Sequence, residues 1–309
     1  MTAVTGSLAC LTAADDSRTV GFRSRPCAAP SVAPEDTGIV IRSVGNHDGQ
    51  LGFGVIAGLG RELLEPLATA VSQLGYGSFW INDSARPDAD GLAGLAVVAT
   101  VAPDLVLGVG VLPLDRRTPE QIADEVRRLA LPLDRLRLGV GSGAAAAPLG
   151  VVRTGVERLR VLLPDARIFV AALGPRMSRL AGEIADGVLF NWAVPDRLRA
   201  GIQWVTEGER DAGGRRIERW AYVRATHGDG ARDLLAAEAG RYARTPAYGR
   251  AFEAMGVPFE TVGVAGDDLA QQLAAYREVL DGVVVRAVPR EWRLADALAI
   301  ARKAAERNR

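Results

Sequence analysis

Short apolar runs alternate with amphipathic stretches from Gln50 to the end of the chain. Most of the runs are apolar at nearly every position and are bounded by Gly, Pro or polar residues. A continuously apolar run of this length is typical of a strand that is buried on both faces, as in a parallel sheet. The predicted strands are residues 51–58, 76–83, 105–114, 136–143, 167–174, 186–192, 219–228 and 281–288.

Apolar residues recur at helical spacing between these predicted strands. Thr118 followed by Pro119 predicts the start of a helix, because threonine caps the first turn and proline fits its first position. Strands that each lead into a helix predict an α/β fold, a (β/α)8 TIM barrel, with an open doubly wound sheet as the alternative. The predicted helices are residues 61–74, 118–130, 155–163, 195–212 and 291–306.

Two segments depart from this repeat. Residues 229–280, between the seventh and eighth predicted strands, are long enough for a helical insertion, which in a barrel would form a cap beside the C-terminal mouth. Residues 1–45 are rich in Ser, Thr, Ala and Pro and show no sustained period. They are predicted to be a flexible N-terminal extension, or to result from a translation start placed too early. Residues 46–309 then form a single domain.

Charge and composition narrow the class of partner. The 37 basic and 37 acidic side chains cancel and basic residues are scattered, which argues against nucleic acid or an anionic membrane as a partner. The chain has no run of about 18 uncharged apolar residues, so no transmembrane helix is predicted. Its first residues lack the charge and apolar run of a signal peptide. We therefore expect a cytoplasmic protein that binds a small molecule.

Reactive side chains are scarce at the ends of the predicted strands. The single lysine lies close to the C-terminus, so no strand carries one for Schiff-base chemistry. The cysteines, Cys10 and Cys27, precede the barrel, and the histidines are His47 and His227. Two histidines cannot supply a zinc or dimetal site, so no metal is expected, and Asp83 alone cannot supply the carboxylate pair of a glycosidase. A bound cofactor that carries the chemistry fits such a site better.

Glycines at two strand ends suit a cofactor of this kind. The stretches LGVGSG (138–143) and AALGP (171–175) let the backbone approach a large flat ligand, although the same glycines also permit tight strand-to-helix turns. A helix that begins near Pro175 and Arg176 would direct free amide groups and a cation toward a phosphate.

Four stretches of the chain carry a more specific signal. They are LVLGVGVLPLDRRTPEQIADEVRRL (105–129), RLRLGVGSG (135–143), FVAALGPRMSRLAGEIADGVLFNW (169–192) and DGVVVRAVPRE (281–291). In order and spacing, the chain from about Gln50 to Asn308 resembles the luciferase-like monooxygenase superfamily, and within it the oxidoreductases that use the deazaflavin coenzyme F420. The resemblance implies a TIM barrel that binds a deazaflavin or flavin at its C-terminal mouth. It also implies a homodimer, because homodimers are common among the relatives.

The resemblance further implies which residues contact the cofactor. In this family a bulge in the third strand, often with a non-proline cis peptide, braces the ring, and Gly108–Val111 match it. The turn after the fifth strand meets the polar tail, and the segment matching Asn82-Asp83-Ser84 contacts the ring or the side chain. The predicted cofactor-binding residues are Asp83, Gly110, Val111, Ser142, Gly143, Ala172, Leu173, Gly174, Pro175, Arg176 and Asn191.

Catalysis is predicted to depend on few side chains. His227, at the end of the seventh strand, and Asp83 are the candidates for proton transfer, although a lone histidine is commonly structural and Asp83 could cap a helix or turn. The segment GSGAAAAPLG (141–150) has alanines where sugar-phosphate-oxidising members of the family carry an acid and an amide, and Ser84 replaces a histidine of several relatives. The alanines put proton transfer from that loop and a sugar-phosphate substrate in doubt.

Three functions therefore stay open at this point. The first is hydride transfer between F420 and an unidentified organic substrate. The second is an FMN-dependent monooxygenase reaction in the same fold. The third is a barrel that binds a ligand as a carrier or sensor without catalysis.

Overall fold

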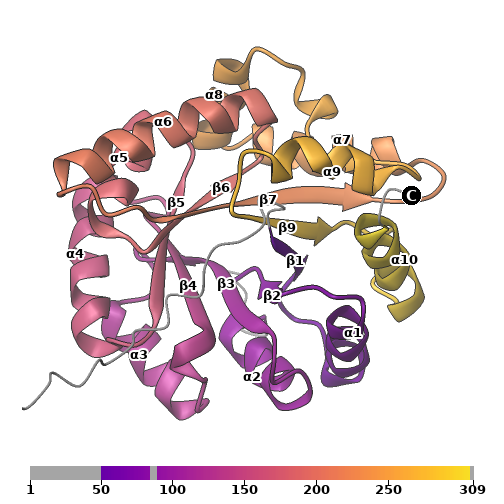
Figure 1. Cartoon of the computed structure of the whole chain (residues 1–309), viewed down its shortest axis with the longest axis horizontal. Helices are drawn as coiled ribbons and strands as arrows, with labels where there is room; N and C mark the ends of the chain where they lie inside the picture. Colours follow the sequence, from indigo (N-terminus) through magenta and orange to yellow (C-terminus); the bar gives the residue numbers. More distant parts are fainter. Residues whose placement is uncertain (1–49, 84–88, 307–309) are drawn as a thin grey trace, which may run out of the picture. The chain divides into compact units, whose positions relative to one another are not determined.

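Parallel strands close into a barrel in the computed structural model, which describes residues 50–83 and 89–306. Each strand pairs with the next, β7 pairs with both β6 and β9, and β9 pairs with β1, so the ring is complete (Figure 1). This closure confirms the TIM barrel and excludes the open doubly wound sheet. The barrel strands are β1 (Gln50–Val55), β2 (Ser78–Ile81), β3 (Val106–Pro113), β4 (Leu136–Gly141), β5 (Arg167–Ala172), β6 (Gly187–Asn191), β7 (Glu218–Thr226) and β9 (Gly282–Ala287).

Helices cover the outside of the barrel. The first turn of α3 is held by a capping box, in which the Thr118 hydroxyl accepts from the Gln121 amide at 3.2 Å and the Gln121 side chain accepts from the Thr118 amide at 2.9 Å. The helix after β2 was not predicted, because GLAGLAVVATV is apolar on every side and has no helical period. The outer helices are α1 (Arg61–Gln73), α2 (Gly91–Val101), α3 (Pro119–Arg128), α4 (Pro148–Leu162), α5 (Pro175–Ile184), α6 (Pro195–Asp211) and α10 (Leu294–Ala305), with a short η1 (Leu133–Arg135) before β4.

The segment between β7 and β9 is the predicted helical insertion. It also contains a strand that the sequence pattern did not predict, β8, which pairs with the end of β7 through Thr226 and Ala265. Its two residues are too few to produce an apolar run. The elements of the insertion are α7 (Ala231–Ala243), α8 (Pro246–Met255), η2 (Phe259–Thr261), β8 (Val264–Ala265) and α9 (Leu269–Arg277).

Several sequence predictions lie outside the described residues. These are the extension over residues 1–45, together with the predictions that involve Cys10, Cys27, His47 and Ser84.

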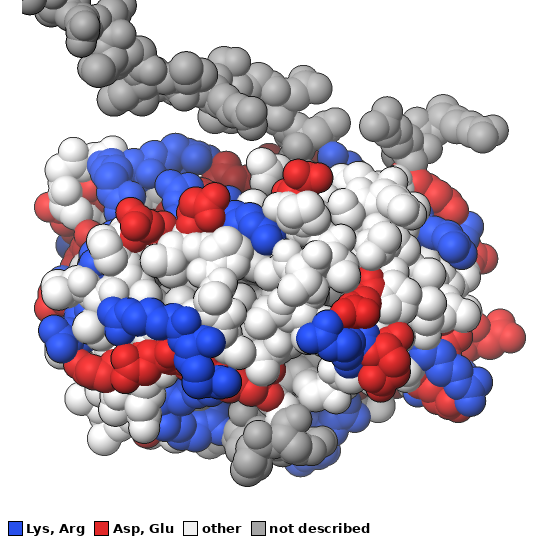
Figure 2. All heavy atoms as spheres, turned by 90° about the horizontal axis from the view of Figure 1, so that it is seen from below, with Lys and Arg blue, Asp and Glu red and all other residues white. Residues whose placement is uncertain are grey.

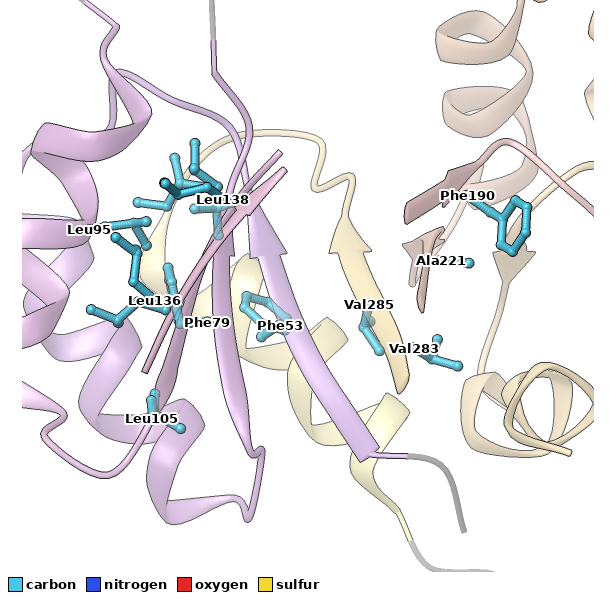
Figure 3. Close-up of a cluster of buried hydrophobic side chains, with 14 of the residues drawn as sticks. Phe53, Phe79, Leu95, Leu105, Leu136, Leu138, Phe190, Ala221, Val283 and Val285 are labelled. Carbon is cyan, nitrogen blue, oxygen red and sulfur yellow. The ribbon is translucent and has the colours of Figure 1, made fainter. Parts of the chain in front are cut away.

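Hydrophobic side chains fill both faces of the strands. Side chains on the outer faces, such as Phe53, Phe79 and Leu138, pack against the surrounding helices (Figure 3). A second cluster fills the barrel itself, where large aromatic rings lie against glycines of neighbouring strands. A Cβ atom at Gly108 would lie only 2.1 Å from the indole of Trp80, so the glycine makes room for the ring.

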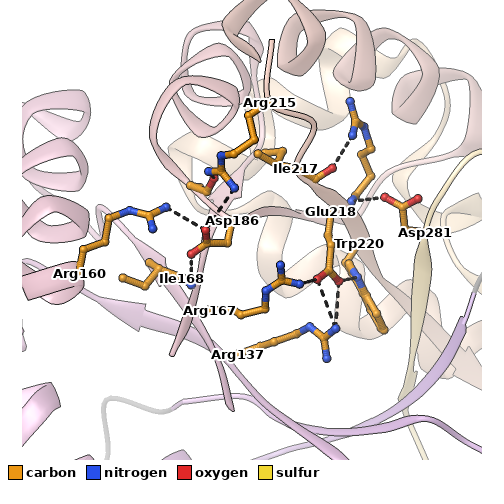
Figure 4. Close-up of polar contacts among 12 residues, drawn as sticks. Arg137, Arg160, Arg167, Ile168, Asp186, Arg215, Ile217, Glu218, Trp220 and Asp281 are labelled. Carbon is orange, nitrogen blue, oxygen red and sulfur yellow. Dashed lines mark hydrogen bonds and ion pairs between the residues drawn. The ribbon is translucent and has the colours of Figure 1, made fainter. Parts of the chain in front are cut away.

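Charged side chains close the barrel at the N-terminal ends of its strands (Figure 4). The Glu218 carboxylate accepts hydrogen bonds from Arg137 at 3.1 Å, from the Trp220 indole at 2.8 Å and from Arg167. The Arg137 guanidinium lies 5.3 Å from the centre of the Trp220 ring. Cations that extend into this end of the barrel are therefore each matched by a carboxylate or an aromatic face.

Two aspartates complete this N-terminal end. Asp186 accepts from Arg160 at 3.1 Å and from the Ile168 amide at 2.9 Å (Figure 4). Asp281 accepts from the Arg216 side chain at 2.6 Å. These contacts join β5, β6 and β7 to the helices and to the turn before β9. This end of the barrel is thus built for stability.

The face seen in Figure 2 has no extended patch of basic or of acidic side chains. Positive and negative side chains are interspersed there around an uncharged area. Within the described residues, no helix has the length and apolar content needed to cross a bilayer.

Candidate functional site

A cleft of about 560 Å³ lies at the carboxyl ends of β4 and β5. The turn after β5 and the start of α5 form one wall, and α8 of the insertion forms another. Five of the predicted cofactor-binding residues line it, namely Ser142, Leu173, Gly174, Pro175 and Arg176. The cleft falls within the usual size of a small-molecule or cofactor site, about 300–1,000 Å³.

Three arginines from three different helices line this cleft. They are Arg176 of α5, Arg197 of α6 and Arg250 of α8, and none forms an ion pair with a carboxylate of the described residues. Arg197 stacks on Trp204 at 4.7 Å and donates to the Leu173 carbonyl at 3.4 Å. Burial lowers the pKa of its guanidinium. The cleft therefore carries an excess of positive charge that suits an anionic ligand.

The start of α5 adds backbone donors to the same cleft. Gly174 is the N-cap residue, and it makes no side-chain hydrogen bond to the first turn, so the amides of that turn remain available. A Cβ atom at Gly174 would meet nothing within 4 Å, which means that the backbone here borders open space. Together with Arg176, this helix start has the donor set that binds phosphate in many proteins.

The bulge predicted in the third strand is confirmed. The peptide bond between Gly110 and Val111 is cis, and the register between β3 and β4 shifts between Gly110 and Leu112. Gly110 lies against the barrel interior, where an added Cβ would be 2.9 Å from the Tyr222 hydroxyl. That hydroxyl is buried and has no hydrogen-bond partner among the described residues.

The turn after β4 is shaped by an aspartate. Gly143 has a φ of +56°, and a Cβ there would lie 1.8 Å from Asp115, whose carboxylate accepts from the Ala144 amide at 2.8 Å. Ser142 therefore lines the main cleft, while Gly143 is required by the backbone of the turn. Ala172 and Asn191 do not line the main cleft but a much smaller neighbouring cavity of about 20 Å³.

Asp83 lies at the mouth, where its carboxylate interacts with neighbouring protein groups. Its carboxylate lies 3.5 Å from Arg117 and accepts from the Gly91 amide at 3.3 Å. Arg117 also pairs with Asp90, the N-cap residue of α2, at 2.5 Å. Asp83 thus fastens the start of α2 to the loop before α3, a role that agrees with the helix-cap alternative.

His227 does not line the cleft. Its Nδ1 atom lies 2.9 Å from the Asp267 carboxylate and 3.2 Å from the Gly266 carbonyl. Side chains alternate along β7, and Tyr222 and Arg224 point into the barrel, so His227 falls on the outward register. The structure therefore brings together the predicted residues around the turn after β5 and leaves His227 apart from them.

Sequence reasoning did not select the buried arginines of the mouth. Arg224 on β7 donates to Asn191 and, at 3.3 Å, to the Tyr242 hydroxyl of α7, and Arg286 on β9 donates to Asn82 at 3.0 Å. Both side chains are almost completely buried. The signal was present in RWAYVRATHG and DGVVVRAV, where an arginine interrupts an otherwise apolar strand.

The residue after β6 has a strained backbone. Trp192 has a φ of +50°, which is unfavourable for a bulky residue, and its ring is buried. The Arg224 guanidinium lies 4.3 Å from the ring centre. Outliers of this kind cluster at ligand sites, because the surrounding structure must hold them in place.

Comparison with known proteins agrees with this architecture. A family model described as luciferase-like monooxygenase matches residues 61–160. A 5,10-methylenetetrahydromethanopterin reductase of Methanolobus tindarius is 26% identical over 180 aligned positions, which cover 47% of this chain and 55% of the relative. The match thus spans about half the length of that relative.

Solved structures with the same fold include F420-dependent and FMN-binding enzymes. An F420-dependent secondary alcohol dehydrogenase, in complex with an F420–acetone adduct, superposes with a TM-score of 0.67 at 16% identity, over 84% of this chain and 100% of that chain. The F420-dependent tetrahydromethanopterin reductase of Methanopyrus kandleri gives a TM-score of 0.62 at 16% identity, over 84% and 98%.

An FMN complex has the same fold with a lower TM-score. The oxygenating constituent of 3,6-diketocamphane monooxygenase from Pseudomonas putida gives a TM-score of 0.53 at 15% identity, over 82% of this chain and 98% of that chain. At these identities the likeness shows the fold, which is the barrel described above. In the matching family model and in the reductase relative, the chain is similar to the luciferase-like monooxygenase family.

Proposed function

We propose that this chain is an oxidoreductase that binds coenzyme F420 in the cleft at its barrel mouth and transfers a hydride between the deazaflavin and a small organic substrate. The observation that carries the proposal is the cleft of about 560 Å³ lined by three arginines that pair with no described carboxylate. The names of the F420-dependent relatives support the choice of cofactor.

The residues of the mouth fit a cofactor with a flat ring and an anionic tail. Arg176, Arg197 and Arg250, with the amides at the start of α5, would hold the tail. Small residues at Val111, Gly141 and Ala171 leave a smooth surface for the ring beside the β3 bulge. When bound, the deazaflavin would supply the hydride chemistry, which no side chain of the mouth can perform.

The chain itself would position its ligands and exclude water. The insertion carries Tyr242 and Tyr248 over the end of the barrel, where Tyr248 accepts from Asn191 at 2.8 Å. Covering the site strengthens its electrostatic interactions and keeps solvent from the reacting atoms. Catalysis would then depend more on the positioning of cofactor and substrate than on proton transfer by side chains.

Asp83 and His227 are the proposed groups for proton transfer. Asp83, held beside Arg117, would accept a hydrogen bond from the ring or the substrate. His227 would have to turn away from Asp267 before it could act at the mouth. Asp83 is therefore the better-placed group of the two.

An equilibrium titration tests the proposal. Purified protein is titrated with oxidised F420, reduced F420 and FMN, and binding is followed by the fluorescence of the cofactor or of tryptophan. We expect micromolar or tighter binding of F420 and weaker binding of FMN. If FMN bound tightly and F420 did not, the flavin-dependent alternative would replace the proposal, and if neither bound, the oxidoreductase assignment would fail.

A pair of glycine variants locates the binding site. Gly174→Trp should abolish F420 binding, because the backbone there is extended and the new side chain would fill the cleft. Gly150→Trp is the matched control, since Gly150 is equally open but lines a different cleft, between α3 and α4. Equal affinities of the two variants would contradict the proposed position. Binding without turnover on any substrate would favour the carrier or sensor alternative.

Location and assembly complete the proposal. We propose that the protein is cytoplasmic and, on the basis of the family resemblance, that it forms a homodimer. Size-exclusion chromatography with light scattering tests the dimer, and a monomer mass would refute it.

A further inference from the structure

Two buried arginines stand side by side where the barrel opens. Arg224 on β7 and Arg286 on β9 are partners in the parallel register, and both point into the barrel above Tyr222 and Val284. Only 1% of Arg224 and 5% of Arg286 is exposed to solvent. A guanidinium is rarely buried to this extent unless its charge is matched.

The charge of this arginine pair is only partly matched. Glu238 of α7 is the one carboxylate among the described residues that reaches both, through the same oxygen, at 3.5 Å from Arg224 Nε and 3.8 Å from Arg286 Nη2. Both distances exceed the 2.7–2.9 Å or so of a well-formed ion pair. Burial lowers the pKa of Arg286, and the neighbouring Arg224 cation lowers it further, whereas Glu238 raises it.

Neutral groups fix both guanidiniums in position. Arg224 donates to Asn191 and stacks on Trp192 at 4.3 Å, and Arg286 donates to Asn82 at 3.0 Å. These partners orient the two cations but do not neutralise them. The pair is therefore organised in advance of any ligand, with donors of both arginines directed at the same point.

Glu238 belongs to the insertion between β7 and β9, outside the ring of barrel strands. Helix α7 begins directly after Gly228 and Gly230, which have φ values of +92° and +67°, and α8 ends at Gly256, with a φ of +68°. Glycine suits these cap positions because it adopts the left-handed region without steric cost. The barrel carries the arginines, and the insertion carries their carboxylate.

We propose that Arg224 and Arg286 form the binding site for a carboxylate group of the substrate, and that Glu238 occupies this site until the substrate displaces it. This inference rests on the proposed function, and it identifies the substrate as a carboxylic acid. Asn191, which contacts both Arg224 and the small cavity beside the main cleft, links the carboxylate site to the cofactor cleft.

Thermal unfolding with small anions tests the proposal without turnover. Wild type, Glu238→Gln and Glu238→Gln with Arg286→Met are melted in acetate, in the uncharged isostere acetamide, in inorganic phosphate and in chloride at matched ionic strength. Glutamine keeps the size of Glu238 and removes its charge, so acetate no longer competes with an internal anion.

We expect acetate to bind Glu238→Gln about tenfold more tightly than wild type. At a concentration about ten times its dissociation constant, it should raise the melting temperature of this variant by about 3 °C, whereas acetamide and chloride should not. Removing Arg286 should abolish the response. Because the response is a stabilisation, it can be measured even if Glu238→Gln starts from a lower melting temperature.

Three outcomes would overturn the inference. Equal responses to acetate and acetamide would mean that no carboxylate site exists. A response that survives Arg286→Met would place the anion elsewhere, and a larger response to phosphate than to acetate would replace the carboxylate assignment. Titration of the same preparations with F420 keeps this test apart from the proposed function, since cofactor binding and the acetate response can fail independently.

Discussion

The arginines at the two ends of the barrel differ in how closely they are paired with carboxylates. At the N-terminal end, Glu218 receives Arg137 and Arg167, and each of these arginines lies within 3.1 Å of a carboxylate oxygen. At the C-terminal mouth, Arg224 and Arg286 share one carboxylate oxygen at 3.5 and 3.8 Å. The three arginines of the cleft pair with no described carboxylate.

Paired and unpaired guanidinium groups have different consequences for the chain. A guanidinium matched inside the chain stabilises the native state, whereas one left unmatched retains its attraction for an external anion. TIM barrels place their active sites at the C-terminal ends of the strands, and the three arginines of the cleft lie at that end. The arginines that close the N-terminal end are thus paired with carboxylates, whereas the three that line the cleft are not.

The largest effect is expected at the N-terminal end. Glu218→Gln removes the carboxylate shared by Arg137 and Arg167, and because Arg137 is only 11% exposed, its charge is left largely buried. We expect the free energy of unfolding to fall by about 3 kcal/mol, measured by urea denaturation, with the affinity for F420 unchanged.

An exposed ion pair provides the control for this prediction. Asp124→Asn breaks the contact with Arg127, in which both side chains are more than half exposed. Its effect on unfolding should stay within about 0.5 kcal/mol. A loss as small as this for Glu218→Gln would show that the N-terminal end contributes nothing special to stability.

The cleft arginines should behave in the opposite manner. Arg176→Met removes a cation that has no ion-pair partner among the described residues, so unfolding should change by less than about 0.5 kcal/mol. The dissociation constant for F420 should rise about tenfold, because a charge-assisted contact to the anionic tail is lost. Arg158→Met, in the cleft between α3 and α4, is the control and should leave the affinity within twofold. Unchanged affinity in Arg176→Met would remove this arginine from the site.

The smallest expected effect concerns a tyrosine below the mouth. The Tyr222 hydroxyl is buried without a partner among the described residues, so Tyr222→Phe should raise the free energy of unfolding by about 1 kcal/mol. Tyr76→Phe is the matched control: its hydroxyl donates to the Ala301 carbonyl at 2.9 Å, so the same change should destabilise by about 1 kcal/mol. Changes of the same sign in both variants would contradict the distinction.

Alkaline pH sharpens the same comparison. Burial raises the pKa of Tyr222 in the folded chain, while the unfolded residue ionises near pH 10 or so. Ionisation above this pH therefore favours the unfolded state, and stability falls as pH rises. Tyr222→Phe should lose stability less steeply than wild type between about pH 10 and 11, by about 1 kcal/mol over that interval. Parallel unfolding curves for the two proteins would refute this contribution.

The barrel was predictable because its signal is repeated. Each predicted strand is present in the structure. A short apolar run that ends at Gly, Pro or a polar residue, repeated eight times between helical patterns, is typical of buried parallel strands. Helix α2 escaped prediction because its apolar residues surround the helix, and β8 escaped because it has only two residues. Neither element was predicted, because one pattern is uniformly apolar and the other is too short to show a periodicity.

The candidate site was less predictable than the fold. The turn around Gly174 could be anticipated, because glycine, proline and arginine follow a strand end in sequence. The arginine pair could not, because Arg224 and Arg286 meet only when β7 and β9 pair, and Glu238 reaches them from an insertion whose path the sequence leaves undefined. His227 was selected for its residue type and its place at the end of the seventh strand, but the outward register of β7 takes it away from the cleft.

A crystal structure of the chain with F420 bound would show directly whether the mouth is the cofactor site. We expect the ring to lie against the β3 bulge at Val111, with the anionic tail along Arg176 and Arg250. This expectation would be contradicted by a cofactor bound away from the carboxyl ends of β4 and β5, or by a mouth that stays empty at saturating F420.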